Sequence, residues 1–141
     1  MLYRKLLTAL VLAGTILVPT ASFAAPANSA PCIFQEHHVV SVTPYRVEDR
    51  VGRTSFQVLR GAAVYVQAEP GLTAEWLRHR FEQHVTDTRQ VAMSDCALDA
   101  GDVRVEVESS GSGFLVKLIA PNTAKGEEVL RRARLLGPLS S

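Results

Sequence analysis

The first 24 residues constrain this chain most, because they indicate where it folds and how much of it remains to fold. Two basic residues, at positions 4 and 5, precede an almost unbroken apolar run over residues 6–18, and Ser22 and Ala24 supply the small residues of a cleavage site. This arrangement is typical of a secretory signal peptide. The run is shorter than the roughly 18 to 20 apolar residues that cross a bilayer. We therefore expect residues 1–24 to be removed and the mature chain to be periplasmic, without a membrane span.

Removal of this segment leaves one domain of balanced charge. The 15 basic residues of the chain fall to 13 while the 14 acidic residues remain, so the formal charge is −1 over 117 residues. A chain of this length buries about two thirds of its unfolded surface, which is enough for a hydrophobic core. Nucleic acid and anionic membranes both favour a basic face, and the largest basic cluster here is Arg131, Arg132 and Arg134. We therefore expect neither as a partner.

Two cysteines, Cys32 and Cys96, remain in the mature chain. An isolated pair of thiols in an oxidising compartment predicts one structural disulfide. A thiol-based redox enzyme instead favours a close Cys-x-x-Cys pair, and these two residues are far apart in the sequence. Cys32 also follows Pro31 and lies well after the apolar run, which argues against a lipoprotein.

Apolar patterns predict a single α+β domain over residues 39–138, after a flexible leader at residues 25–38. Alternating apolar residues predict three strands, at 62–67, 103–107 and 114–119. Apolar residues at i, i+3 and i+4 spacing predict two helices, one capped by Thr73 and one that begins near Asn122. The segment 39–58 mixes valines, charges and Pro44, and predicts one or two short strands or a single turn of helix.

The predicted order is β-α-β-β-α, which indicates a small two-layer sandwich. Each helix has a single apolar stripe, so we expect both helices to cover the same face of the sheet. This is a ferredoxin-like half that lacks its last strand and has an irregular N-terminal segment. Either the segment 39–58 supplies the missing strand or the sheet keeps an exposed edge, which would invite a partner strand.

Large aliphatic residues fall on the outer side of the predicted sheet. Leu115 and Ile119 alternate with core positions, so they lie beside Arg104, Glu106 and Glu108. Such residues indicate a contact surface, unless the segment 39–58 folds over them and completes a third layer. Trp76, at the edge of the first helix's apolar stripe, is either a partner anchor or the rim of the core.

Histidines are the residues with the most obvious chemical use. His37 and His38, with Glu36 beside them, form a candidate site for zinc, copper or nickel. The opposing interpretation is that adjacent histidines in a strand point to opposite faces and chelate one ion poorly. His84 flanks the core stripe of the first helix, which favours a half-buried structural role. No other cofactor is expected.

The chain resembles a group of small uncharacterised exported proteins of Gram-negative bacteria. The resemblance rests on Pro70-Gly71-Leu72-Thr73-Ala74-Glu75-Trp76-Leu77, on His84 and Cys96 downstream, and on the closing Glu128-Val129-Leu130-Arg131-Arg132-Ala133. It covers roughly residues 61–136. It implies an exported domain with a cysteine pair and no known activity.

These observations favour a non-enzymatic domain, monomeric or weakly dimeric, that binds another component of the cell envelope. Two alternatives remain open. One is a metal-binding protein that uses His37, His38 and Glu36. The other is an inhibitor of a secreted hydrolase, in which a disulfide-pinned loop at residues 90–101 fills the enzyme's cleft.

Overall fold

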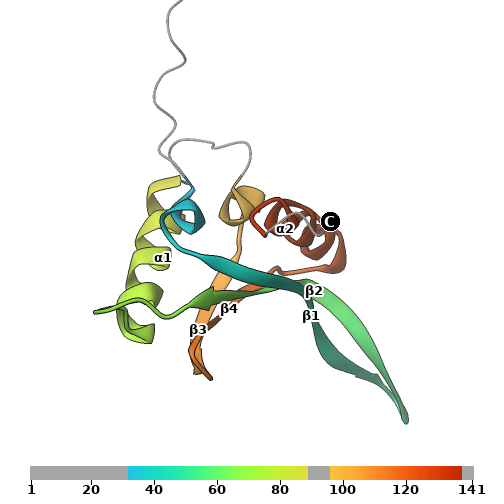
Figure 1. Ribbon diagram of the computed structural model, residues 1–141. Coiled ribbons are helices and arrows are strands. Elements are labelled where there is room, and N and C mark those ends of the chain that lie inside the picture. The colour runs from blue at the N-terminus through green and yellow to red at the C-terminus, as the bar shows by residue number, and fades with distance from the viewer. Residues whose placement is uncertain (1–31, 89–95, 138–141) are drawn as a thin grey trace, which may run out of the picture.

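Figure 1 shows a computed structural model of the protein, which describes residues 32–88 and 96–137. The predicted signal peptide and most of the predicted leader lie outside the described residues. The fold is α+β, with one four-stranded antiparallel sheet and two α-helices. In chain order, the elements are η1 (Ile33–Glu36), β1 (Val39–Val51), β2 (Thr54–Gln67), α1 (Ala74–Thr88), η2 (Ala97–Ala100), β3 (Arg104–Ser110), β4 (Gly113–Ile119) and α2 (Thr123–Arg134).

The sheet and the helices form two layers. The strand order is β1-β2-β4-β3, and each neighbouring pair is antiparallel. Because β2 and β3 both run antiparallel to β4, they are parallel to each other, and α1 lies in the connection between them. Both helices cover one face of the sheet, where α2 packs mainly on β2 and α1 on β3 (Figure 1).

The N-terminal segment is regular, in contrast to the sequence prediction. β1 is a strand of 13 residues that pairs with β2 from Val39 opposite Val66 to Val51 opposite Thr54. Gly52 has a φ of 64°, a conformation that suits glycine, and it makes the tight turn between the two strands. Pro44 is tolerated because β1 is an edge strand. β1 therefore occupies the sheet edge that the sequence analysis left open.

Part of the segment predicted as a flexible leader is packed into the domain. The described part of the predicted leader forms η1, in which Ile33 and Phe34 are 3% and 1% exposed. Two large apolar side chains this close to a disulfide-bonded cysteine are drawn into the core because burial of their surface is favourable.

The core lies between the sheet and the helices. One buried cluster contains side chains from both helices and both hairpin strands, including Leu77, Phe81, Val105, Val116 and Leu130, which confirms that each helix packs its apolar stripe on the sheet. The Phe34 ring packs against the Phe81 ring, with centroids 4.7 Å apart. η1 thus contributes an aromatic side chain to the centre of the fold.

Local capping and one close approach position the helices on the sheet. The Thr73 hydroxyl accepts the backbone N–H of Trp76 at 3.2 Å, and the Asn122 side chain accepts that of Lys125 at 2.9 Å. Both contacts are N-caps, as the sequence predicts. Gly126 lies directly against the backbone of Arg60 and Gly61, where a Cβ atom would be crowded, so α2 can pack tightly on β2.

Candidate protein-binding face

The sheet face opposite the helices, called the outer face below, brings together side chains from all four strands. Strand register aligns them in three rows, which are Tyr45-Gly61-Ile119-Arg104, Thr43-Ala63-Lys117-Glu106 and Ser41-Tyr65-Leu115-Glu108. The residues between them in β4, Val116 and Leu118, are fully buried beneath the helices. Leu115 and Ile119 therefore lie on the outer side, where each is partly exposed.

The outer face combines apolar and charged side chains, with Lys117 between Leu115 and Ile119 on β4. Charged residues gather along β3, where Arg104 and Glu106 form an ion pair at 3.1 Å. Lys117 donates to Glu108 at 2.6 Å, and this hydrogen bond is the main reason why the pKa of Lys117 is raised. The Lys117 ammonium also lies 5.9 Å from the centre of the Tyr45 ring. This contact connects a side chain of β4 to one of β1 across the face. Apolar side chains beside polar and charged ones are found together in protein interfaces.

No helix or strand of the described chain covers the outer face (Figure 1). The expectation that the segment 39–58 folds over Leu115 and Ile119 is wrong, because this segment lies within the sheet as β1 and the first part of β2. Val39 of this segment is buried in the core, and Val42 packs against it.

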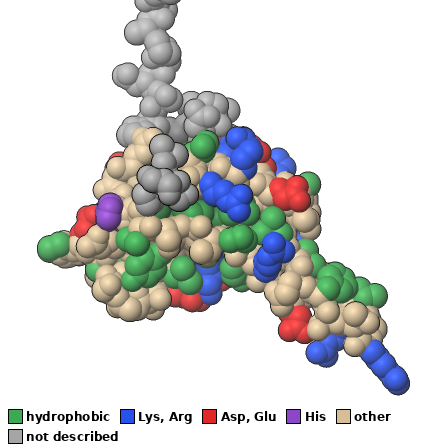
Figure 2. Space-filling view, turned by 45° about the vertical axis from the view of Figure 1, so that its right-hand side comes forward, with side chains coloured by type: hydrophobic (Ala, Val, Ile, Leu, Met, Phe, Trp, Pro, Cys, Tyr) green, Lys and Arg blue, Asp and Glu red, His purple; other side chains and the backbone are tan. Residues whose placement is uncertain are grey.

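The β1–β2 hairpin extends well beyond the rest of the sheet. β2 pairs with β4 only from Gly61 onward, so residues 46–59, called the arm below, pair only with each other in the described chain. Figure 2 shows the arm projecting from the body, with basic side chains at its end. Val51 and Phe56 are 66% and 44% exposed. A hairpin without a covering layer is marginally stable by itself, so the arm is suited to gain stability from a binding partner.

The two sides of the arm differ in polarity. Register places apolar residues on the side that continues the outer face, namely Val47 opposite Val58, Phe56 opposite Asp49, and Val51 opposite Thr54. The other side carries Arg46, Glu48, Arg50, Ser55 and Gln57, with Leu59 at its base. The apolar surface of the outer face therefore extends along the arm.

The arm was not predicted, although the sequence contains a signal for it. Tyr45, Val47 and Val51 recur at even spacing before Gly52, and Phe56 and Val58 recur at even spacing after it. Even spacing on both sides of a glycine turn is typical of a β-hairpin. Pro44 and the intervening charges obscured this pattern.

Trp76 lies in the helical layer, on the other side of the sheet from Leu115 and Ile119. It is 45% exposed on the first turn of α1, with the Arg80 guanidinium 5.7 Å from its ring centre. The His37 ring meets it edge-on at 6.0 Å. The three residues proposed as a partner surface thus do not form one patch.

The structure does not bring the candidate metal ligands together. Each has a different neighbour. Glu36 pairs with Arg80 at 3.6 Å, and His38 Nδ1 is hydrogen-bonded to the side-chain oxygen of Gln67 at 2.6 Å. The His37 side chain is only 6% exposed, and its Nδ1 is 4.0 Å from Glu69. Within residues 32–88 and 96–137, no group of three or more His, Cys, Asp or Glu side chains is arranged to bind a metal ion.

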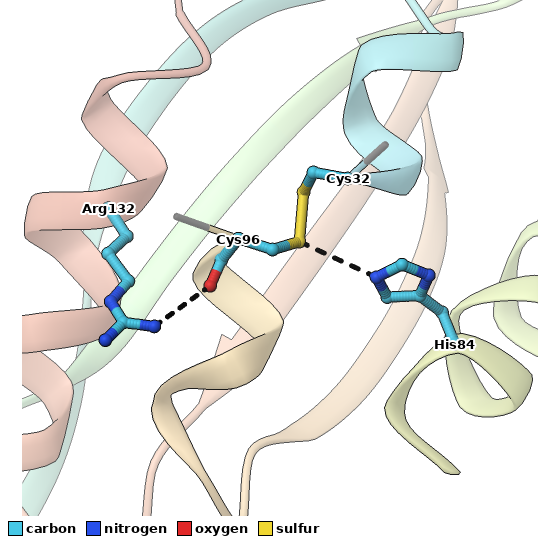
Figure 3. The surroundings of a disulfide bond; sticks show 4 residues. All are labelled: Cys32, His84, Cys96 and Arg132. Atoms are coloured by element: carbon cyan, nitrogen blue, oxygen red, sulfur yellow. Dashed lines mark hydrogen bonds between the residues drawn. A yellow bond between two sulfur atoms is a disulfide. The ribbon is translucent and has the colours of Figure 1, made fainter. Parts of the chain in front are cut away.

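Cys32 and Cys96 are joined by a disulfide, as the sequence predicts, with Cα atoms 5.3 Å apart. Both residues are buried, and they precede η1 and η2 respectively. Figure 3 shows two polar side chains that contact Cys96: His84 Nε2 lies 3.7 Å from its Sγ atom, and Arg132 donates to its backbone carbonyl at 3.4 Å. The disulfide thus links the start of the domain to a point where α1 and α2 both make contact.

His84 makes the stability of this region depend on pH. Burial lowers its pKa below the ordinary value of 6.5, against the opposing effect of carboxylates, of which Asp99 is the strongest. The unfolded chain therefore binds a proton more readily than the folded chain as the pH falls below 6.5, so protonation favours unfolding. We expect the free energy of unfolding to decrease over this range. Urea unfolding at several pH values should show a smaller decrease in His84→Gln.

The matched control for this measurement is His79→Gln, because His79 is an exposed histidine on the same helix. It should retain the pH dependence of the wild type. Equal pH dependence in the wild type and His84→Gln would contradict the assignment.

Half of the loop proposed for a hydrolase inhibitor, residues 90–95, lies outside the described residues, and the other half contains η2, in which Ala97, Leu98 and Ala100 are buried. Of the helices in the described ranges, none has the length and apolar content needed to cross a membrane. The chain matches no protein-family model, no curated protein and no solved structure.

Proposed function

We propose that the chain is an exported, non-enzymatic periplasmic domain that uses its outer face and arm to bind another protein of the cell envelope. The N-terminal segment of the sequence supports export, since its basic residues, apolar run and small residues follow the pattern of a signal peptide. The Cys32–Cys96 disulfide is consistent with an oxidising compartment.

One observation carries the proposal, which is the run of partly exposed apolar side chains that leads from Ile119 through Tyr45 to Val47 and Val58 of the arm, with Leu115 beside Tyr65 at the other end of the face. Tyr45 links the two regions, because it neighbours Ile119 through Gly61 and precedes Val47 on the same side of β1. Exposed apolar surface of this kind marks interaction sites in soluble domains, and aromatic residues supply much of the binding energy. The partner we infer is a folded protein with an apolar patch, because the charged β3 side provides the polar rim of such an interface.

We also infer that the fold is a variant of the ferredoxin-like arrangement. In that arrangement, a β-α-β-β-α-β chain forms one antiparallel sheet with two helices on one face. Here β2, α1, β3, β4 and α2 follow this order, and β1 takes the edge beside β2 that the last strand would occupy. The strand at this edge thus comes from the start of the chain, and its extension forms the arm.

The double variant Leu115→Ser/Ile119→Ser tests the proposal. Both side chains are partly exposed on a face without a covering layer, so we expect little change in the melting temperature and a loss of partner binding. Binding is measured in cells with a photo-crosslinking residue in place of Thr43, which lies on the same face. The wild-type background should give a discrete crosslinked product that the double variant lacks.

Arg78, an exposed residue of α1 in the opposite layer, is the control position for the crosslinker. A product obtained equally from positions 43 and 78 would contradict the proposed surface. A large loss of stability in the double variant would show instead that Leu115 and Ile119 belong to a covered core. A product with twice the mass of the chain would report self-association of the chain, and only a product of another mass would identify an envelope protein.

A further inference from the structure

The free edge of β1 is a second interaction surface, distinct from the outer face. β1 is at the end of the sheet, and β2 is its only strand neighbour in the described chain. The opposite edge of β1 therefore presents unpaired backbone N–H and C=O groups to any strand that approaches it. Such an edge binds another strand mainly through main-chain hydrogen bonds, and the side chains decide which strand fits.

Charges on this edge restrict the strands that fit. Residues 46–51 read Arg-Val-Glu-Asp-Arg-Val, and in the described chain Arg46 and Glu48 form no ion pair. Both side chains are exposed. Charged edge residues normally prevent pairing with other strands, since like charges directly opposite each other are destabilising. A strand with the complementary order of charges would be favoured instead.

A second copy of β1 supplies this complementary order. Two identical strands pair antiparallel around a two-fold axis perpendicular to the sheet, and such an axis keeps each side chain on its own face. Residues opposite each other must therefore be an even number of positions apart. One central residue then lies opposite its own copy, and the axis runs between the two. In the arm, the possible central residues are 46, 47, 48, 49 and 50.

Of the registers centred on a residue of β1, only the one centred on Val47 places opposite charges of β1 against each other without opposing like charges. The other four central positions in the arm hold Arg46, Glu48, Asp49 and Arg50, so each would place a charge opposite the same charge. With Val47 at the centre, Arg46 of each copy faces Glu48 of the other. These are two opposite-charge cross-strand pairs on one face, and the Val47 side chains meet on the other face.

We propose that two copies of the protein associate through the β1 edge of their arms, in the register centred on Val47. The two sheets then form one continuous eight-stranded sheet, and the apolar sides of the two arms become adjacent. The proposal rests on the edge of β1 and its charges, and it does not depend on the partner proposed for the outer face.

Charge reversal tests the register. Sedimentation equilibrium of the protein purified after export should show a reversible dimer. Arg46→Glu and Glu48→Arg should each raise the dissociation constant at least about tenfold, because each replaces two favourable pairs with two repulsive ones. The double variant Arg46→Glu/Glu48→Arg should restore dimerisation, since it re-creates both pairs with the charges exchanged.

Arg53→Glu is the matched control, because it makes the same change in charge at the turn beyond the paired residues. It should dimerise like the wild type. Unchanged melting temperatures would show that all variants are folded. A wild-type protein that stays monomeric, a dimer unaffected by the single reversals, or equal weakening by Arg53→Glu would each overturn the proposal.

Cysteine crosslinking provides a second, independent measurement. In the proposed register, Val47→Cys faces its own copy at a Cα separation of about 4.5–5.5 Å, within the range of a disulfide. Val51→Cys lies on the same side of the same strand, but its copy would be about 27 Å away along the strand. Mild oxidation should therefore crosslink Val47→Cys and leave Val51→Cys monomeric. The reverse result would exclude this register.

Discussion

Replacement of Phe81 with alanine is expected to lower the free energy of unfolding by about 3–5 kcal/mol. Phe81 is fully buried, and its ring packs on Phe34 from the N-terminal segment. Its removal would leave a cavity between α1, η1 and the sheet and would separate two aromatic side chains. A loss of this size is a large part of the 5–15 kcal/mol that stabilises most domains. Urea unfolding followed by circular dichroism measures it directly.

His79→Ala is the control for this experiment, because His79 is exposed on the same helix. A surface change of this kind should alter the free energy of unfolding by no more than about 0.5 kcal/mol. If Phe81→Ala unfolds at the same urea concentration as the wild type, the face of α1 that packs on the sheet has been assigned wrongly.

Removal of the disulfide by Cys32→Ala/Cys96→Ala is expected to cost about 4 kcal/mol. The bond joins residues separated by 64 positions, so its loss greatly increases the conformational freedom of the unfolded chain. It also releases η1, whose Ile33 and Phe34 side chains lie in the core. The free energy of unfolding of the double variant should therefore fall by a similar amount to that of Phe81→Ala.

Reduction of the wild-type protein provides the matched comparison, since it breaks the same bond without changing the side chains around it. Its unfolding midpoint should move in the same direction as that of the double variant. Mass spectrometry of the untreated protein should show the loss of two protons. Two free thiols in the exported protein would contradict the disulfide.

The layer of helices and the β3–β4 hairpin could be predicted from the sequence because their patterns are local. Helix caps at Thr73 and Asn122 and the alternation of residues 103–119 each specify an element without help from the rest of the chain. The same alternation placed Leu115 and Ile119 on the outer face. A strand that is buried against helices on one side only shows a clear alternation of apolar and polar residues.

β1 and the arm could not be predicted in the same way. Of residues 46–59, only Leu59 packs against the core, so the rest of the arm need not be strictly apolar, and Pro44 just before it interrupts the pattern further. η1 was missed for the opposite reason. Ile33 and Phe34 are buried by a disulfide partner and an aromatic contact from distant parts of the chain, and neither is visible in a local pattern.

A single strand, β2, forms both the most deeply buried part of the sheet and one half of the arm. Its inner half holds Val64 and Val66, which are fully buried, and its outer half holds the exposed Phe56. The backbone continues from one half to the other without a loop, and the register of β1 and β2 shifts at the junction, between Tyr45 and Arg46. A load applied at the tip of the arm is therefore carried along two paired strands into the centre of the domain. Anything that grips the arm acts mechanically on the whole fold.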